Sequence, residues 1–483
     1  MSDYYDVIVI GGGAGGLTAA SGAAAFGAKT ALIHEGPLGG DCLWTGCVPS
    51  KALLHTAQLI HSARRAAPFG FTQTTPLDYT KIREHYLKAI RVIQKHDDPA
   101  RFEGLGVTIF PGKGAFVDDR TVMINGQQQI TGDRIIIATG SRPFIPSIPG
   151  LQKVGYVTNE TFWEMTDLPK RWLALGAGPI GLELGQALRR FGCEVTILER
   201  ASTILANEEP ETVGHLRAAL EQEGIHILTN ATATYFAKHK QAIQVTLQIE
   251  GRVQQLVVDR ILVAAGRVAN TAGLNLEQAG VEVDEKGRVV VDQQLRTTRK
   301  HIYAVGDVNG RMPFTHVAGA EGKAAISHAL FHVKSKLDYD TIPTVLYTDP
   351  EFVQLGWTEQ EARRRGVRCQ TYRLSLDQVD RFITDDEANG LLKVVTDHKG
   401  KILGAQAVGR GAGDLLQEVV FAKHFNHKIG ALSQVIHPYP SRVGAVQQTA
   451  DLYWREKLFS GRLNQLLKLY ARLLRRWRRK GKK

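Results

Sequence analysis

The stretch YDVIVIGGGAGGLTAA, from Tyr5 to Ala20, decides the fold of the N-terminal part of the chain. A short apolar run, typical of a buried β-strand, leads into Gly11, Gly13 and Gly16 at the spacing GxGxxG, and small residues follow as a helix. A second apolar run, KTALIHE, ends at Glu35, 24 residues after Gly11. This pattern predicts a dinucleotide-binding unit, in which the glycines admit a pyrophosphate at the helix N-terminus and Glu35 binds a ribose.

The same pattern recurs in RWLALGAGPIGLELGQALRRFGCEVTILER, from Arg171 to Arg200. Gly176, Gly178 and Gly181 follow an apolar strand, and Glu199 closes the next strand 23 residues after Gly176. A single GxGxxG is weak evidence of nucleotide binding. Two complete units in one chain predict two different dinucleotides.

Three shorter signals join a strand to a glycine: IIIATGSRP (135–143), ILVAAGRVAN (261–270) and HIYAVGDVNG (301–310). Each of the first two is consistent with a generic strand and turn, but their positions favour crossing points where the chain enters and leaves an inserted module. From these segments we add the following to the predicted cofactor-binding residues: Thr139, Gly140, Gly266, Gly306 and Asp307.

The stretch GGDCLWTGCVPSK, from Gly39 to Lys51, holds two of the four cysteines, Cys42 and Cys47. A structural disulfide does not fit a reducing compartment, and four cysteines in 483 residues do not describe a disulfide-stapled secreted protein. Zinc would require further ligands in recognisable clusters, which are missing from the neighbouring sequence, so no metal site is predicted. Redox chemistry is the remaining interpretation.

Length and composition indicate a folded protein of two to four domains, with 43% apolar and 22% charged residues. No apolar run approaches the ~18 residues of a membrane span. The N-terminus has no basic region ahead of its apolar stretch, unlike a signal peptide. We therefore expect a cytoplasmic protein.

The net charge of +12 is concentrated at the C-terminus. Ten Lys or Arg residues and no acid lie between Arg462 and Lys483, which leaves +2 for the first 461 residues and argues against nucleic acid as a partner. Apolar residues recur in this segment at helical spacing: Leu463, Leu466, Leu467, Tyr470, Leu474 and Trp477. Such a basic amphipathic helix fits either peripheral binding to an anionic membrane or packing on a dimer with a frayed end.

The ordered set of motifs resembles the pyridine nucleotide–disulfide oxidoreductases, a family that includes mercuric reductase, dihydrolipoyl dehydrogenase and glutathione reductase. The resemblance covers about residues 4 to 455 and includes IPTVLYTDPEFVQLGWTE (342–359), which is similar to the start of the family's dimerisation domain. It implies an α/β fold, a homodimer, FAD in the first unit and NADH or NADPH in the second. The expected domains are 1–150 and 271–340 for FAD, 151–270 for NAD(P), 341–455 for dimerisation and a basic tail at 456–483.

The resemblance also implies roles for the residues around the cysteines. Cys47 would lie against the flavin as the charge-transfer thiolate, and Cys42 would face the substrate. Lys51 would contact the flavin and pair with Glu183, and Asp307 would bind the ribityl chain of FAD. Electrons would pass from the nicotinamide to the flavin and then to the disulfide.

Glu199 bears on the choice between NADH and NADPH. A carboxylate at this position accepts hydrogen bonds from a free 2′-hydroxyl and repels a 2′-phosphate, so NADH is favoured. Arg200 follows directly and would soften that preference.

The segment VIHPYPSRVGAV, from Val435 to Val446, departs from the thiol–disulfide members of the family. Tyr439 stands where those members carry a histidine, and Gly444 stands where they carry a glutamate. His437, two residues before Tyr439, is a candidate for the site or an ordinary loop histidine. A tyrosine at this position is similar to mercuric reductase, but the pair of adjacent C-terminal cysteines of that enzyme is missing here. The Tyr439–Pro440 bond is a candidate for the cis form.

The sequence therefore predicts an FAD enzyme that passes electrons from NAD(P)H to a Cys42–Cys47 disulfide and on to a small acceptor, either a disulfide or a metal ion. Two alternatives remain open. One is a membrane-surface dehydrogenase that reduces a quinone or another acceptor from the flavin. The other is a redox-sensing flavoprotein with little turnover.

Overall fold

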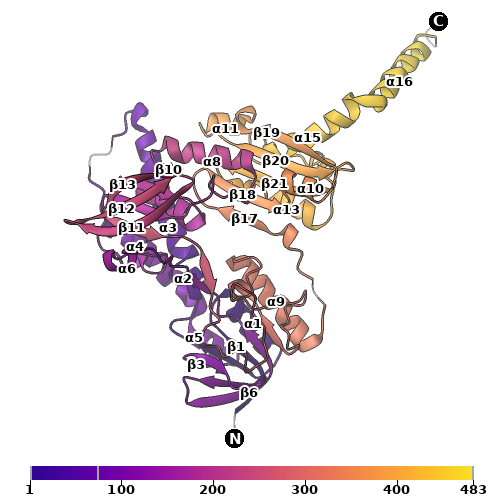
Figure 1. Cartoon of the computed structure of the whole chain (residues 1–483). Helices are drawn as coiled ribbons and strands as arrows, with labels where there is room; N and C mark the ends of the chain where they lie inside the picture. The colour runs from indigo at the N-terminus through magenta and orange to yellow at the C-terminus, as the bar shows by residue number, and fades with distance from the viewer. Residues whose placement is uncertain (1–2, 73–74, 335, 481–483) are drawn as a thin grey trace. The chain divides into compact units, whose positions relative to one another are not determined.

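The computed structural model describes residues 3–72, 75–334 and 336–480, and these residues form two compact units (Figure 1). Unit 1 comprises residues 1–204 and 223–338, and unit 2 comprises residues 205–222 and 339–483. The predicted α/β fold class is confirmed, because unit 1 holds two sheets with parallel strands and their crossover helices.

The first sheet of unit 1 has the order β3-β2-β1-β6-β5-β4, and β16 also pairs with β6. Parallel pairing joins β1, β2, β3, β6 and β16, whereas β4 and β5 pair antiparallel. The strands are β1 (Asp3–Ile10), β2 (Thr30–His34), β3 (Val107–Pro111), β4 (Gly114–Phe116), β5 (Thr121–Ile124), β6 (Gln128–Ile137) and β16 (Ile302–Ala304).

Both faces of this sheet are covered. Along β1, Val7 and Val9 enter one core cluster with α1 (Ala14–Ala25) and α9 (Thr315–Phe331), which pack against each other. Ile8 and Ile10 enter a second cluster on the opposite face. A strand buried on both faces reads as a continuous apolar run rather than an alternating one, which is why the segment before Gly11 has that composition.

The second sheet of unit 1 has the order β10-β9-β8-β14, all parallel. Its strands are β8 (Arg171–Leu175), β9 (Glu194–Leu198), β10 (His226–Leu228) and β14 (Arg260–Val263), and α7 (Pro179–Arg190) connects β8 to β9. An antiparallel sheet of β11 (Ala231–His239), β12 (Ala242–Ile249) and β13 (Arg252–Val258) shares its core.

The two crossing points expected from the sequence lie next to each other. The strands β7 (Ser141–Pro143) and β15 (Arg267–Ala269) pair antiparallel, with Arg142 opposite Val268. The chain therefore leaves the first sheet and returns to it through a single two-stranded ribbon.

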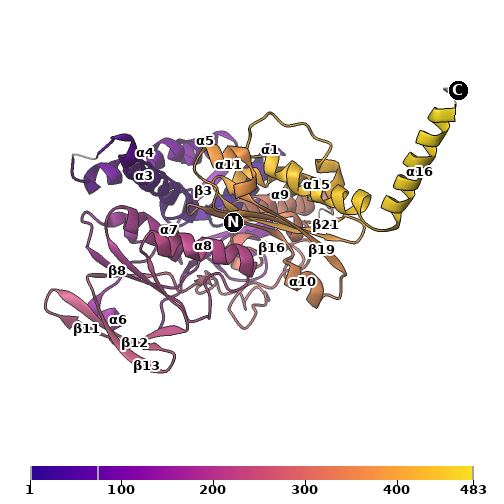
Figure 2. The same cartoon turned by 90° about the horizontal axis from the view of Figure 1, so that it is seen from above.

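The cysteine-containing stretch forms α2 (Gly40–Trp44) and the start of α3 (Cys47–Arg65). Helix α3 lies beside α4 (Tyr79–Gln94), as Figure 2 shows. The side chain of Asp78 caps α4 by accepting hydrogen bonds from the backbone N–H groups of Thr80 and Lys81.

Unit 2 is built on an antiparallel sheet of order β17-β18-β21-β20-β19. Its strands are β17 (Pro343–Leu346), β18 (Glu351–Gly356), β19 (Cys369–Ser375), β20 (Leu391–Asp397) and β21 (Ile402–Gly409). The helices of unit 2 are α8 (Pro210–Gln222), α10 (Glu359–Arg364), α11 (Asp380–Thr384), α12 (Ala412–Leu415), α13 (Gln417–His424), α14 (Ile429–Leu432), α15 (Gly444–Phe459) and α16 (Gly461–Lys480).

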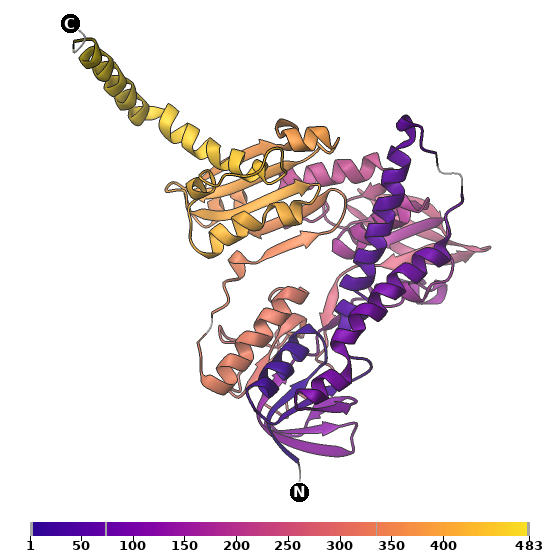
Figure 3. The same cartoon turned by 180° about the vertical axis from the view of Figure 1, so that it is seen from behind.

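Helix α16 follows α15 at the C-terminal end of the chain (Figure 3). Residues 481–483 of the predicted basic tail lie outside the described residues. Within the described part of the chain, no helix combines the length and the apolar composition that a membrane span requires.

The remaining elements of unit 1 are short: α5 (Pro99–Gly104), α6 (Leu151–Val154), η1 (Ala67–Phe69), η2 (Lys95–Asp97), η3 (Phe162–Glu164) and η4 (Gly306–Asn309). In unit 2, η5 (Tyr339–Thr341) and η6 (Leu376–Gln378) are single 3₁₀ turns.

Packing at Gly16 gives a test of the fold. A Cβ at this position in α1 would lie 1.8 Å from the carbonyl oxygen of Gly11, so Gly16→Ala forces the glycine loop away from β1. We expect a loss of about 1–3 kcal/mol in unfolding free energy, measured by denaturant titration. Gly214→Ala in α8 is the control, because a Cβ there meets nothing within 4 Å. Equal unfolding midpoints for the two variants would contradict the close approach.

Candidate active site

The two glycine-rich loops have the same local geometry. Gly11 has φ +114° and Gly176 has φ +110°, and a Cβ would lie 2.2 Å from the Ala138 carbonyl oxygen at the first and 2.4 Å from the Ala264 carbonyl oxygen at the second. Only glycine fits a positive φ at such an approach. Each loop then opens a helix of 12 residues, α1 or α7.

The helix start leaves room for a ligand at both loops. Gly13 and Gly178 are the N-caps of α1 and α7, and neither helix N-terminus is capped by a side chain. A Cβ on Gly178 would meet nothing within 4 Å, and one on Gly13 would first meet Gly40 Cα at 3.9 Å. Uncapped N–H groups beside open space suit a pyrophosphate, so both sites fit a dinucleotide.

The acids predicted to bind ribose lie after β2 and β9. Glu35 is exposed, and its Oε1 lies 3.3 Å from Lys113 Nζ. Glu199 accepts hydrogen bonds from the backbone N–H of Ala177 at 3.0 Å and of Ala201 at 2.9 Å. These bonds hold the Glu199 carboxylate against the second glycine loop.

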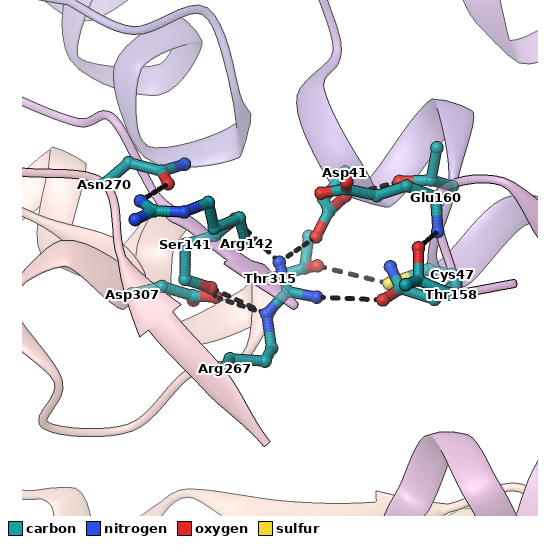
Figure 4. Close-up of polar contacts among 12 residues, drawn as sticks. Asp41, Cys47, Ser141, Arg142, Thr158, Glu160, Arg267, Asn270, Asp307 and Thr315 are labelled. Carbon is teal, nitrogen blue, oxygen red and sulfur yellow. Dashed lines mark hydrogen bonds and ion pairs between the residues drawn. The ribbon is translucent and has the colours of Figure 1, made fainter. Parts of the chain in front are cut away.

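Asp307, which is predicted to bind the ribityl chain, lies near the β7–β15 ribbon (Figure 4), as do the other cofactor-binding residues predicted from the shorter strand–glycine segments. Ser141 Oγ donates to Asp307 Oδ2 at 2.5 Å, and Arg267 Nε lies 3.7 Å from the same oxygen. Thr139 Oγ1 donates to the Asn270 carbonyl at 2.7 Å. Three predicted glycines have positive φ: Gly140 (+68°), Gly266 (+123°) and Gly306 (+75°).

The two cysteines lie on successive helices, Cys42 in α2 and Cys47 at the first position of α3. Both are free thiols. Cys47 Sγ lies 3.2 Å from Thr315 Oγ1, and Thr315 is the first residue of α9. The sulfur therefore lies where two long helices begin, a position that favours a thiolate because each helix N-terminus carries partial positive charge.

The electrostatics separate the two thiols. The pKa of Cys47 is lowered to about 6, mainly because Cys42 donates a hydrogen bond to it. The hydrogen bond with Thr315 and the positive charge of Lys51 lower it further, whereas burial raises it. The pKa of Cys42 is raised by the same hydrogen bond and by burial. The two thiols are thus inequivalent, with Cys47 favoured as the thiolate and Cys42 as the thiol.

Lys51 and Glu183 form an ion pair, with Lys51 Nζ 2.9 Å from Glu183 Oε2. Glu183 lies in α7 and is buried, so the pair joins α3 to α7 within unit 1. The positive charge of Lys51 lowers the pKa of Cys47 and the negative charge of Glu183 raises it.

The residues predicted at the C-terminal motif lie in unit 2. His437 Nε2 lies 2.8 Å from Glu418 Oε1, and His437 Nδ1 lies 3.4 Å from Gln447 Oε1. Tyr439 is 81% exposed, and its hydroxyl donates to Asp380 Oδ2 at 2.6 Å, which raises the pKa of the phenol. The Tyr439–Pro440 bond is cis.

Sequence reasoning missed several contacts in unit 1 and one in unit 2. Trp163 Nε1 donates to the carbonyl of Thr45 at 2.9 Å, Arg267 pairs with Asp41, and Glu418 approaches His437. Each joins residues far apart in the sequence, and no local pattern signals such a contact. Trp44 is half-buried and donates to the Leu38 carbonyl at 2.8 Å, which holds its ring against its own loop.

Among the described residues, no group of three or more His, Cys, Asp or Glu is placed to hold a metal ion.

Comparison with known proteins identifies the family of the chain. Residues 5–322 match the pyridine nucleotide-disulphide oxidoreductase family, and residues 342–450 match the dimerisation domain of the same family. The chain is 34% identical to a mercuric reductase of Bacillus cereus over 90% of its own length and 69% of the relative's. It is 35% identical to a dihydrolipoyl dehydrogenase of Thermus scotoductus over 94% and 98% of the two chains.

Among solved structures, the flavoprotein disulfide reductase RclA of Escherichia coli, in a Cu(II) complex, aligns with a TM-score of 0.83 and 27% identity. The alignment covers 94% of this chain and 100% of RclA. The chain therefore belongs to the pyridine nucleotide–disulphide oxidoreductase family. It is an FAD-dependent enzyme that uses NADH or NADPH, and its dimerisation domain supports a homodimer.

The opposite effects of Lys51 and Glu183 on Cys47 give a test of the site. Cys47 reacts as a thiolate above its pKa of about 6, so the rate of its alkylation by iodoacetamide in the reduced protein should rise through that pH. Lys51→Met should move the midpoint up by about one unit, and Glu183→Gln should move it down.

The midpoint is read from the Cys47 peptide by mass spectrometry. Lys113→Met is the matched control, because it removes a lysine from an ion pair with Glu35 at the surface. Shifts of the same sign in the Lys51 and Glu183 variants would contradict the electrostatic account.

Proposed function

We propose that the enzyme passes two electrons from NADH to the Cys42–Cys47 disulfide, and that Cys42 then hands them to a small thiophilic acceptor. The observation that carries this proposal is the position of Cys47, whose sulfur lies 3.2 Å from Thr315 Oγ1 at the starts of α3 and α9, together with the asymmetry that favours Cys47 as the thiolate and Cys42 as the thiol. A pair of cysteines in a purely structural role would have no need of that asymmetry.

The balance of the reaction matches this asymmetry. A hydride equivalent carries two electrons and one proton, and a disulfide that accepts it becomes one thiol and one thiolate. When FAD is bound, it supplies the two-electron exchange between nicotinamide and disulfide. The negative charge of the Cys47 thiolate is stabilised by Lys51, by Thr315 and by the N-termini of α3 and α9. The proton stays on Cys42.

Glu199 supports NADH as the preferred donor. Its carboxylate is fixed by the N–H groups of Ala177 and Ala201. A carboxylate oxygen retains acceptor capacity after one such bond, so it can accept from a ribose hydroxyl and repels a 2′-phosphate. The neighbouring Arg200 is exposed.

The acceptor is proposed to be a soft metal ion or a small disulfide that reaches Cys42. Relatives named mercuric reductase and dihydrolipoyl dehydrogenase represent these two classes. Tyr439 presents an exposed phenol, and Gly444 has no side chain to act as an acid or base. Without an imidazole and a carboxylate at those positions, an acceptor that needs little proton transfer is favoured, which points to the metal ion.

A stopped-flow experiment with Cys42→Ser tests this function. In the wild-type enzyme, NADH should produce a long-wavelength charge-transfer band faster than NADPH does, and Hg(II) or a small disulfide should bleach it. Cys42→Ser should lower turnover with those acceptors by at least about 100-fold, since the interchange thiol is lost. Reduction of ferricyanide, which can take electrons from the flavin alone, should persist.

Other outcomes assign other functions. Quinone reduction at an unchanged rate in Cys42→Ser, with no activity toward disulfides or Hg(II) in the wild type, would assign the enzyme as a flavin dehydrogenase. Negligible oxidation of NADH and NADPH with every acceptor would assign a redox sensor.

Helix α16 supports a second proposal, peripheral association with an anionic membrane. It has 20 residues and no acid, and most of its described large apolar side chains are exposed, whereas Leu474 is half-buried: Leu466, Leu467, Leu469, Tyr470, Leu473 and Trp477 are the exposed ones. Basic residues lie between them at Lys468, Arg472, Arg475 and Arg476, and Arg478 and Arg479 follow Trp477. Each basic residue near an anionic surface contributes about 1 kcal/mol, and the apolar side chains can enter the headgroup region.

Vesicle sedimentation tests this proposal. Full-length protein should sediment with phosphatidylglycerol vesicles and a variant ending at Ser460 should stay in solution. Leu473→Ser with Trp477→Ser is the matched control. It keeps every charge, so its binding should weaken about tenfold or more and become more sensitive to salt. Equal sedimentation of the full-length and shortened proteins would show that α16 packs on the dimer instead.

A further inference from the structure

The turn between the two cysteines contains a backbone carbonyl that needs a partner from outside α3. Thr45 lies between α2, which ends at Trp44, and α3, which begins at Cys47. In a continuing helix the Thr45 carbonyl would accept from the amide four residues later. That residue is Pro49, which has no N–H. Thr45 is half-buried, so a donor from elsewhere in the fold stabilises this carbonyl where α3 offers none.

Trp163 supplies this donor. Its indole Nε1 donates to the carbonyl oxygen of Thr45 at 2.9 Å, although the two residues are 118 positions apart. Trp163 lies in η3, just after the chain crosses toward the second dinucleotide sheet, and is 6% exposed.

The indole ring is itself held in place. The rings of Tyr86 in α4 and Trp163 meet edge to face, with centroids 5.2 Å apart and an interplanar angle of 72°. The Tyr86 hydroxyl donates to the Trp163 carbonyl at 3.3 Å, and the Phe162 ring packs on the indole at 5.0 Å. A ring fixed on two sides presents its N–H in one direction.

Other contacts hold the rest of the turn but not the Thr45 carbonyl. Asp41 accepts a hydrogen bond from Thr45 Oγ1 and pairs with Arg267, as Figure 4 shows for the Asp41–Arg267 contact. A Cβ on Gly46 would lie 2.9 Å from the Asp41 carbonyl oxygen, so the backbone of the turn is closely folded on itself. The indole is the contact that fixes the peptide group directly before Gly46 and Cys47.

We propose that Trp163 is a positioning residue for the redox pair, because its indole N–H anchors the Thr45 carbonyl and keeps Cys42 and Cys47 within bonding reach. This inference rests on the proposed function, in which the two cysteines cycle between disulfide and dithiol. Reduction breaks the S–S bond with two electrons and one proton from a hydride equivalent, giving the Cys42 thiol and the Cys47 thiolate. Reoxidation passes two electrons to the acceptor and re-forms the S–S bond. The Cys42 proton goes to solvent when the acceptor is a metal ion, and to one of the two product thiolates when the acceptor is a disulfide.

The anchor favours the disulfide side of this equilibrium. A disulfide requires its two sulfur atoms at bonding distance, so a turn that holds them together raises the effective concentration of one thiol toward the other. A looser turn leaves the dithiol free to separate. Loss of the indole N–H should therefore make the disulfide easier to reduce and weaken the hydrogen bond from Cys42 to Cys47.

Trp163→Phe tests the anchor, because it removes the N–H donor and keeps a buried aromatic ring. The FAD-loaded enzyme is equilibrated in glutathione buffers, trapped with an alkylating agent, and the Cys42–Cys47 disulfide fraction is read by mass spectrometry. We expect the equilibrium to move three- to tenfold toward the dithiol, where tenfold is a rise of ~30 mV in potential. The pH midpoint for alkylation of Cys47 should rise in the same variant.

Trp172→Phe is the matched control. Trp172 is a buried tryptophan of unit 1 whose Nε1 donates to the Pro169 carbonyl at 2.8 Å, a bond of the same kind outside the redox turn. Its equilibrium should equal that of the wild type. A shift in Trp163→Phe no larger than that of Trp172→Phe would overturn the inference.

Tyr86→Phe keeps the test decisive if Trp163→Phe does not fold. It removes the hydroxyl that orients Trp163 and keeps the ring, so a smaller shift toward the dithiol is expected, and an unchanged equilibrium would count against the anchor. The same experiment distinguishes failure of the proposed function from failure of the positioning role. If the wild-type enzyme forms no reversible Cys42–Cys47 disulfide, the function is wrong, whereas a normal wild type with an unshifted Trp163→Phe rejects only the positioning role.

Discussion

The position of the Cys47 sulfur at the start of both α3 and α9 is the constraint on which the rest of unit 1 depends. The contact between Cys47 and Thr315 spans 268 positions, and the whole second dinucleotide module lies between them in the sequence. The second dinucleotide module can be inserted between these two residues without separating them only if the chain enters and leaves the module at neighbouring positions. The β7–β15 ribbon meets that condition, because it brings the outgoing and returning chains into one antiparallel pair.

The dinucleotide modules were predictable because their physics is local. Gly11 ends the strand with φ +114°, Gly13 is the N-cap of the helix, and a Cβ on Gly16 would lie 1.8 Å from the carbonyl oxygen of Gly11, so the turn from strand to helix is set within six residues. Val7 and Ile8 likewise enter different cores because successive side chains of one strand point to opposite faces of the sheet. Sequence reasoning therefore found both modules and the α/β class.

The contacts around the cysteines were not predictable in the same way. Trp163 follows no motif, and its donor role appears only once Thr45 is brought to it by the fold. The sequence did hold half of that information. Pro49 has no N–H, so it indicates that the Thr45 carbonyl, four residues earlier, receives no hydrogen bond from α3. Glu418 was missed for a similar reason: His437 lies in a loop and its partner lies in α13, 19 positions earlier.

The division of the chain also separates the two halves of the chemistry. The groups that favour a thiolate at Cys47 are Cys42 on α2, Lys51 on α3 and Thr315 on α9, and all of them lie in unit 1. The residues that depart from the thiol–disulfide members, Tyr439 and Gly444, lie in unit 2. Under the proposed function, the asymmetry of the two thiols needs no residue of unit 2, so we expect substitutions at Tyr439 and Gly444 to change the acceptor and to leave the transfer of electrons from NADH to the cysteine pair unchanged. A family built in this way can exchange one acceptor for another without rebuilding its redox centre.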